Sequence, residues 1–291
     1  MIPNSELIHN ADGSIYHLNL CREDVARRII LVGDQARVDK VATYFTNIRT
    51  RIQHREFYTV TGIYGKHEYS VISSGIGTDN IDIVLNELDA LFNLDEESGK
   101  PVPRPEKLKI LRFGTCGGMQ PDLPVGSLVL SNYAIGGDGL LGYYHLPGEP
   151  ALQESIDAFW AKHLRKLPRF FGEAASNIFI EKARQFPEIY HGGTFSAAGF
   201  YAPQGRSLGR ARAVVPNLPQ IIAGFRFRDM PVLNMEMETS AILGLGAALG
   251  HEAGSLSVIL ANRQRGEFAP NPQAEEAKLI EAGLALFESA D

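Results

Sequence analysis

Cysteine and tryptophan are scarce in this chain, and both absences limit what the protein can be. The 291 residues include two cysteines, Cys21 and Cys116, and a single tryptophan. The cysteines are far apart and form neither a CxxC motif nor a Cys/His spacing suited to zinc. We therefore expect no disulfide framework and no metal site. Such sparse cysteine use is typical of a reducing compartment.

The sequence also shows no pattern typical of a membrane anchor or a secretion leader, and no excess of basic residues. The first ten residues, MIPNSELIHN, are polar, and no apolar run approaches the ~20 residues that span a bilayer. We therefore expect a cytoplasmic protein that does not act at a membrane. The formal net charge of −6 argues against a nucleic-acid binder with an extensive basic surface, although a small anion can still bind locally.

The residues that are present indicate one large α/β domain over residues 1–291. Hydrophobic residues make up 44% of the chain and charged residues 21%, which supplies a sizeable core. Short β-rich runs lead through glycine turns into amphipathic helices, as in residues 67–91. This alternation predicts a sheet with helices packed on it, and no internal repeat interrupts the pattern.

Residues 108–118, LKILRFGTCGG, combine a strand with a turn of small residues. Arg112 stands out near the end of the apolar run, because a guanidinium is almost never fully buried without a partner. Gly114 lets backbone N–H groups approach a ligand, and Thr115 adds a hydroxyl donor. The segment therefore predicts an anion site at the carboxyl end of a strand, where open α/β sheets bind ligands. The alternative is that Arg112 pairs with a nearby carboxylate.

An earlier strand, residues 28–32, leads through Gly33 and Asp34 into a helix. Asp34 is a suitable cap for that helix. Arg37 falls in the first turn, where a cation is unfavourable unless the helix end also recruits an anion. The segment predicts a second cation for the same anion, the alternative being an exposed surface arginine.

Aromatic, amide and guanidinium groups come together in the loop that follows the strand at residues 190–196. Phe200, Gln204 and Arg206 could stack on a planar heterocycle and hydrogen-bond along one of its edges. The alternative is an ordinary surface loop. Further along, Glu236 and Glu238 precede an apolar helix, where they either bind hydroxyl groups or cap the helix.

Five separated motifs resemble those of the nucleoside phosphorylase superfamily of the hexameric purine and uridine phosphorylase type. They occur in the family's order and span nearly the whole chain. The motifs are Gly33-Asp34-x-x-Arg37, His54-Arg55-Glu56-Phe57, Arg112-x-Gly114-Thr115-x-Gly117, Phe200-Tyr201-x-x-Gln204-x-Arg206 and Glu236-Met237-Glu238. The Gln-x-Arg pair after Phe-Tyr is similar to uridine phosphorylases in particular.

The resemblance implies the family's fold, a single-domain, three-layer α/β fold with a central mixed β-sheet flanked by helices. It also implies a reaction in which phosphate attacks the anomeric carbon of a nucleoside and releases the base and ribose 1-phosphate. Inorganic phosphate is then a co-substrate, and neither a metal nor an organic cofactor is required.

The same resemblance assigns expected roles to individual residues. Phosphate would be held by Gly33, Arg37, Arg112 and Thr115, with Arg55 of the partner subunit. Ribose would be bound by Met237 and Glu238, with His17 of the partner subunit. The base would contact Phe200, Gln204, Arg206 and Arg263, and the expected catalytic residues are Arg206, Arg112 and Glu238. Sites shared in this way imply a homo-oligomer, either a dimer or a trimer of dimers.

The chain departs from the family pattern at residues 261–264, ANRQ. Many family members carry a Ser-Asp pair at the corresponding place, and in the purine enzymes the carboxyl group of that Asp protonates the base. Asn262 offers no carboxylate, so purine phosphorolysis by that route is disfavoured. Either Arg263 or Arg265 closes over the base. Glu56 is a candidate ligand for a monovalent cation at the interface, and residues 95–106 are expected to form an exposed loop.

Three rival functions stay open from the residues alone. They are a nucleosidase of the same fold that uses water, a purine nucleoside phosphorylase, and a non-catalytic nucleoside-binding protein. The chain keeps Arg37, Arg55 and Arg112, which a hydrolase does not need. We therefore favour a phosphorylase of the uridine phosphorylase type. The sequence does not show whether it also accepts deoxyuridine or thymidine.

Overall fold

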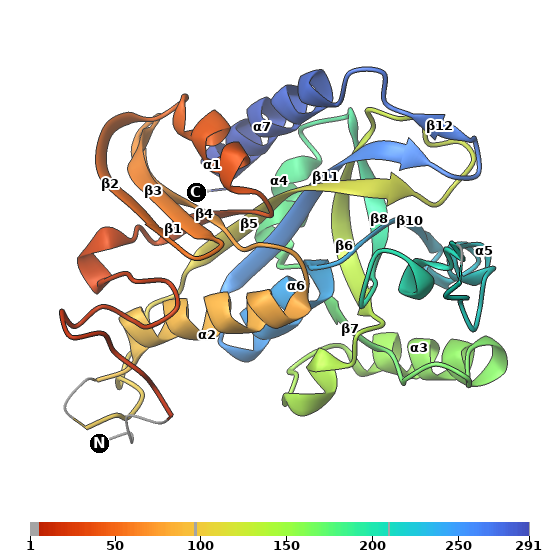
Figure 1. The fold of residues 1–291 in the computed structure, drawn as a ribbon, viewed down its shortest axis with the longest axis horizontal. Coiled ribbons are helices and arrows are strands. Elements are labelled where there is room, and N and C mark those ends of the chain that lie inside the picture. Colours follow the sequence, from red (N-terminus) through yellow and green to blue (C-terminus); the bar gives the residue numbers. More distant parts are fainter. Residues whose placement is uncertain (1–5, 96–97, 209, 291) are drawn as a thin grey trace.

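The strands form one mixed sheet in the computed structural model, which describes residues 6–95, 98–208 and 210–290 (Figure 1). Hydrogen-bonded neighbours follow the order β12-β11-β6-β8-β10-β5-β1-β4-β3-β2, with β7 beside β6 and β9 beside β10. The strands are β1 (Arg28–Val32), β2 (Thr46–His54), β3 (Phe57–Tyr64), β4 (His67–Ser73), β5 (Lys109–Gly118), β6 (Leu128–Gly136), β7 (Phe171–Ala174), β8 (Ile189–Ser196), β9 (Arg226–Phe227), β10 (Met230–Glu236), β11 (Glu252–Asn262) and β12 (Glu267–Phe268).

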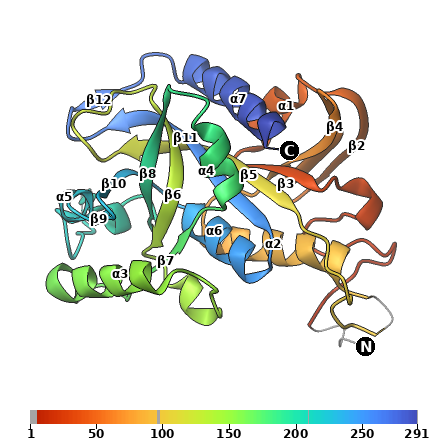
Figure 2. The same cartoon turned by 180° about the vertical axis from the view of Figure 1, so that it is seen from behind.

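Helices cover both faces of this sheet, as Figure 2 shows from behind. The α-helices are α1 (Gln35–Ala42), α2 (Thr78–Asn93), α3 (Pro150–His163), α4 (Asn177–Ala183), α5 (Leu218–Ala223), α6 (Thr239–Ala248) and α7 (Pro272–Ser289). Short 3-10 turns occupy η1 (Arg22–Asp24), η2 (Leu140–Tyr143) and η3 (Ala202–Gln204). Within the described residues, no helix combines the length and apolar character needed to cross a bilayer.

Successive side chains of β1 point to opposite faces of the sheet, which explains why helices pack on both faces. Ile30 and Val32 pack into a core with α1, α4 and α7, whereas Ile29 and Leu31 pack into a second core with α2 and α6. Because successive strand residues point to opposite faces, a continuous apolar run needs a helix layer on each side. The expected arrangement of a central mixed sheet between helices is therefore confirmed.

Part of the sheet closes into a ring, which the sequence did not predict. Strand β11 pairs with β6 and also with β5, so β5, β11, β6, β8 and β10 form a closed set of neighbours. Closure depends on pairings between strands that lie far apart in the chain. Local periodicity reports which residues form strands, but it carries no information about these partners.

The glycine-rich half of residues 108–118 is strand and not turn, so that prediction was wrong. Strand β5 continues to Gly118, and β11 runs parallel to it from Glu252 opposite Lys109 to Asn262 opposite Gly118. The backbone of β11 holds the small residues extended. Small side chains here leave room at the sheet edge, where the candidate site lies.

Residues 50–61 form parts of two antiparallel strands, β2 and β3. The chain reverses at Arg55 and Glu56 between β2 and β3, and Arg55 takes a left-handed φ of 56°. Only a few per cent of residues other than glycine adopt that conformation. In the expected loop at residues 95–106, positions 96–97 lie outside the described residues, while Leu94 forms a β-bridge with Pro101.

Candidate active site

A cavity of about 380 Å³ opens beside the ends of β1, β5 and β10. Its wall contains nine of the residues that sequence analysis assigned to a site. They are Gly33, Arg37, Arg112, Thr115, Phe200, Gln204, Arg206, Met237 and Glu238. Residues more than 200 positions apart in the chain therefore meet in one place. The wall includes Arg37 from α1 and Arg112 from β5, and also residues of the loop around η3.

Arg112 is buried within this wall, and only some of its hydrogen-bond donors have partners. One guanidinium nitrogen, Nη2, donates to the Glu238 carboxylate and lies 3.6 Å from Oε2 of Glu236. The other, Nη1, is buried without a hydrogen-bond partner. Burial lowers the pKa of Arg112, but the two carboxylates outweigh it and the net direction is upward. Arg112 thus pairs with carboxylates, as the alternative held, and keeps one donor for another acceptor.

Gly114 makes room for the Arg112 side chain. A Cβ added at Gly114 would lie 1.5 Å from Nη1 of Arg112 and 2.8 Å from Oγ of Ser257. No side chain can occupy that position unless the guanidinium moves. Sequence analysis gave Gly114 a role through its backbone N–H, and it missed this steric role because the contact arises from the extended course of β5.

Arg37 is buried, so its reading as an exposed surface arginine was wrong. Its Nη2 donates to Oε1 of Glu276 at 3.0 Å and its Nη1 to the carbonyl of Phe113 at 3.4 Å, while Nε has no partner. Glu276 also accepts from Nζ of Lys40 at 2.6 Å. Burial raises the pKa of the Glu276 carboxyl, but Lys40 and Arg37 together bring it below its ordinary value. Glu276 was missed because nothing local in its helix marks it.

The two carboxylates before α6 have different partners. Glu236 accepts from the backbone N–H groups of Glu238 and Thr239 at 2.9 Å each, and thus caps the helix. Glu238 instead accepts from the N–H of Gly77 at 2.8 Å and from Arg112. Burial and the neighbouring Glu236 raise the pKa of Glu238, and Arg112 opposes them. The capping interpretation is therefore confirmed for Glu236, whereas hydroxyl binding by Glu238 stays a prediction.

The loop around η3 turns its polar groups toward the cavity. The Arg206 guanidinium lies 3.9 Å from the centroid of the Phe200 ring and donates to the Gln204 side chain. Burial and the nearby charge of Arg263 lower the pKa of Arg206. The Arg206 guanidinium therefore contacts both the Gln204 amide and the Phe200 ring. An ordinary surface loop would not need such an arrangement.

Of the two arginines after β11, Arg263 is the one near this loop. Arg263 donates to the carbonyl of Gln204 at 2.6 Å and lines a small cavity next to the main one. Arg265 pairs with Glu267 and donates to the carbonyl of Pro121 at 3.0 Å. Asn262 is fully buried, and its amide donates to the carbonyls of Gln120 and Leu123.

His17 and Arg55 are not among the residues that line the cavity. Nδ1 of His17 lies 2.5 Å from Oε1 of Glu87, and Nη2 of Arg55 donates to the hydroxyl of Tyr16 at 3.2 Å. Their expected role from a neighbouring subunit stays a prediction, as does the cation ligand at Glu56. Among the described residues, no group of three His, Cys, Asp or Glu side chains is placed to hold a metal.

Other wall residues had no role in the sequence analysis. Gly75 and Ile76 follow β4, and Phe268, 65% exposed, comes from β12. The glycines on either side of Ile76 predicted a turn, whereas nothing in the sequence near Phe268 indicated a site. Cys116 also lines the cavity, and burial raises the pKa of its thiol to about 12, so it stays protonated.

The chain is similar to known proteins over most of its length. Residues 27–287 match the profile of the Phosphorylase superfamily. A uridine phosphorylase from Thermococcus kodakarensis is 27% identical over 99% of this chain and 92% of its own length, and one from Haemophilus influenzae is 27% identical over 94% and 98%. The crystal structure of a Trypanosoma brucei nucleoside phosphorylase, described as showing uridine phosphorylase activity, matches with a TM-score of 0.87, 30% identity and 98% coverage of both chains.

The fold and the cavity define an α/β protein with a small-molecule site at the edge of a partly closed sheet. With the match over nearly its whole length, the chain belongs to the Phosphorylase superfamily. The family expected from the five motifs is thus confirmed.

Proposed function

We propose that this protein is a uridine phosphorylase, a pentosyltransferase that converts uridine and phosphate into uracil and ribose 1-phosphate. The observation that carries the proposal is one cavity whose wall holds two buried arginines and also an amide beside a guanidinium. The names of the most similar relatives support the same activity. A role in pyrimidine salvage in the cytoplasm is part of the proposal.

Arg37 and Arg112 hold inorganic phosphate, together with Gly33 and Thr115. Both side chains line the cavity, and each has one buried nitrogen without a partner, Nε in Arg37 and Nη1 in Arg112. An oxyanion that accepts from the guanidinium groups on this wall gains charge-assisted hydrogen bonds, worth about 1.5–3 kcal/mol each. Phosphate placed in this way sits ready to attack the sugar, so positioning supplies part of the rate acceleration.

Glu238 and Met237 bind the ribose. The Glu238 carboxylate is buried and accepts from two donors already, and its oxygens can accept further from sugar hydroxyls. As the bond to the base breaks, the sugar gains positive charge. Glu238 on one side and phosphate on the other stabilise that charge better than they stabilise neutral uridine.

Gln204 and Arg206 bind the amide edge of uracil, with Phe200 and Arg263 beside them. Arg206 stabilises the negative charge that the departing base acquires, which makes it the main catalytic group on this side. No metal or organic cofactor takes part in this scheme, although a monovalent cation near Glu56 is compatible with it.

Asn262 argues against a purine-specific route. Its side chain is a carboxamide, which is not a general acid, and the amide already donates to two backbone carbonyls in a fully buried position. A nucleosidase would not need both Arg37 and Arg112 buried around one cavity. A non-catalytic nucleoside-binding protein would not need them either.

Uracil release from uridine, with and without phosphate, tests the proposal. We expect release only with phosphate, and with stoichiometric ribose 1-phosphate. Release without phosphate would identify a nucleosidase, and release of a base from inosine but not uridine would identify a purine enzyme. If neither nucleoside releases its base, the result would support a non-catalytic nucleoside-binding protein.

The proposal includes active sites shared between subunits of a homo-oligomer, either a dimer or a trimer of dimers. Arg55 and His17 do not line the cavity of their own chain, which is compatible with the partner-subunit roles that the family resemblance gives them. Co-expression of Arg55→Ala and Arg112→Ala chains should restore activity that each variant lacks alone. Mixed assemblies that form but stay inactive would contradict shared sites.

A further inference from the structure

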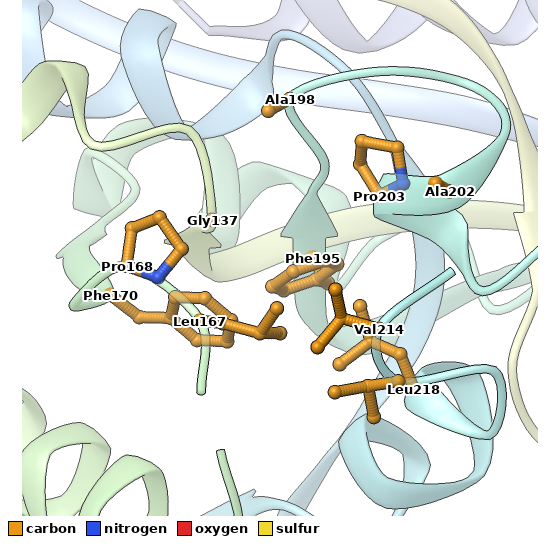
Figure 3. A pocket seen from close by; sticks show the side chains of 11 residues that line it. Gly137, Leu167, Pro168, Phe170, Phe195, Ala198, Ala202, Pro203, Val214 and Leu218 are labelled. Atoms are coloured by element: carbon orange, nitrogen blue, oxygen red, sulfur yellow. The ribbon is translucent and has the colours of Figure 1, made fainter. Parts of the chain in front are cut away.

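A second cavity, of about 260 Å³, lies behind the loop that carries the proposed base-binding groups (Figure 3). Its walls come from four separate parts of the chain. Phe195 and Leu218 form buried surfaces, Leu167 and Phe170 come from the segment between α3 and β7, and Val214 stands at the rim with 68% of its surface exposed. The cavity is therefore reachable from solvent.

Every residue that lines this second cavity is apolar or glycine. A charged or strongly polar molecule would lose its hydration there and gain no partner. The rings of Phe170 and Phe195 lie 5.3 Å apart between centroids at an interplanar angle of 51°. Such a tilted pair leaves ring edges and faces for a further aromatic ring to contact. For scale, an engineered apolar cavity of about 150 Å³ in another protein binds benzene.

The two cavities share one thin wall. Ala202 and Pro203 line the second cavity, while Gln204, the last residue of the same 3-10 turn, lines the first. Anything that fills the space behind Pro203 therefore restricts the turn that presents Gln204. Because linkage is reciprocal, a uracil ring held by Gln204 must act back on the second cavity to the same extent.

We propose that the second cavity binds a small uncharged aromatic molecule of one or two fused rings, and that its occupancy changes the affinity of the neighbouring site for uridine. The first part stands on the cavity alone. The second part rests on the proposed function, since it assigns the uracil ring to Gln204.

The chain carries a built-in reporter for this cavity. Trp160 is its single tryptophan, and the indole N–H donates to the carbonyls of Leu167 at 3.2 Å and Pro168 at 2.9 Å. Both of these residues line the cavity. A molecule that displaces either one alters the surroundings of the indole, so tryptophan fluorescence reports binding directly.

The experiment titrates p-xylene into the full-length protein and follows Trp160 fluorescence, excited where the probe does not absorb. Val214→Asp places a carboxylate at the rim, and Leu208→Asp is the matched control, since Leu208 is 63% exposed and does not line the cavity. We expect saturable binding to the wild type and to Leu208→Asp, weakened at least about tenfold by Val214→Asp because the charge opposes an apolar ligand. No saturable change, or equal binding to both variants, overturns the site.

A second copy of the chain is the competing occupant. If Val214→Asp changes the mass of the assembly while p-xylene does not bind the wild type, a subunit contact covers the cavity and the proposal fails. This readout does not depend on enzyme activity.

Steady-state kinetics test the coupling. With p-xylene saturating, the KM for uridine should shift at least about twofold in the wild type and in Leu208→Asp, while the KM for phosphate stays unchanged. Saturable binding with unchanged KM for uridine overturns the coupling only. If the protein releases no uracil at all, the proposed function fails, and the fluorescence titration still decides whether the site exists.

Discussion

The Nη1 atom of Arg112 lies against the backbone of Gly114, at a point where a Cβ would approach it to 1.5 Å. The same nitrogen has no hydrogen-bond partner in the protein. A glycine two residues along the same strand thus sets where the proposed phosphate-binding guanidinium can lie. A substitution at Gly114 can therefore move the Arg112 guanidinium without removing its charge, so the effect of its position can be measured separately.

Gly114→Ala should lower kcat/KM roughly ten- to hundredfold, because displacing Arg112 removes about one charge-assisted hydrogen bond to phosphate. The KM for phosphate should rise more than the KM for uridine. Gly117→Ala is the matched control in the same strand and cavity, where the nearest atom to an added Cβ is 3.8 Å away. Equal losses in the two variants would show that Gly114 has no special steric role.

Glu276→Gln should raise the KM for phosphate several-fold and leave the KM for uridine nearly unchanged. Glu276 holds Nη2 of Arg37 at 3.0 Å, and a neutral amide holds a guanidinium less firmly than a carboxylate does. Glu281→Gln is the control, since Glu281 is an exposed residue of the same helix and its carboxylate accepts from the Tyr44 hydroxyl at 3.3 Å. A uniform rise in both constants would indicate a general disturbance of α7.

Arg206→Ala should lower kcat for uridine more than it raises KM. The reason is that Arg206 is proposed to bind the charge that develops on uracil, which is present in the transition state and not in the substrate. Arg212→Ala, an exposed arginine further along the same connection, serves as control. An increase in KM at unchanged kcat would mean that Arg206 binds the base without stabilising its departure.

Glu173→Gln should raise the melting temperature at neutral pH. Glu173 is 4% exposed, its Oε2 has no partner, and burial raises the pKa of its carboxyl. A carboxyl whose folded pKa is raised binds protons more tightly in the folded state, so the wild type loses stability as pH rises through that range. The advantage of the variant should therefore vanish below the ordinary pKa of a glutamate, about 4.3.

Thermal unfolding measured across this pH range checks the prediction. Glu181→Gln is the matched control, because Glu181 is an exposed carboxylate in the neighbouring helix α4. A gain in melting temperature for Glu173→Gln that does not change with pH would contradict an electrostatic origin.

Local patterns in the sequence carried much of the fold and of the cavity wall. The continuous apolar run of β1, the Asp34 cap and the Gln204-x-Arg206 pair can each be recognised within a few residues of sequence. The Asp34 side chain accepts from the N–H of Ala36, as expected. The features that the sequence did not predict depend on contacts between distant parts of the chain. They include the pairing of β11 with β5, which keeps the glycines of β5 extended, and the hydrogen bond from Arg37 to Glu276.

A crystal structure of the protein soaked with phosphate and uridine tests the central claim most directly. The account predicts phosphate within hydrogen-bond distance of both Arg37 and Arg112, and the uracil ring on Gln204 and Arg206 in the same cavity. Phosphate bound elsewhere, or a base that leaves Gln204 and Arg206 without contact, would contradict it.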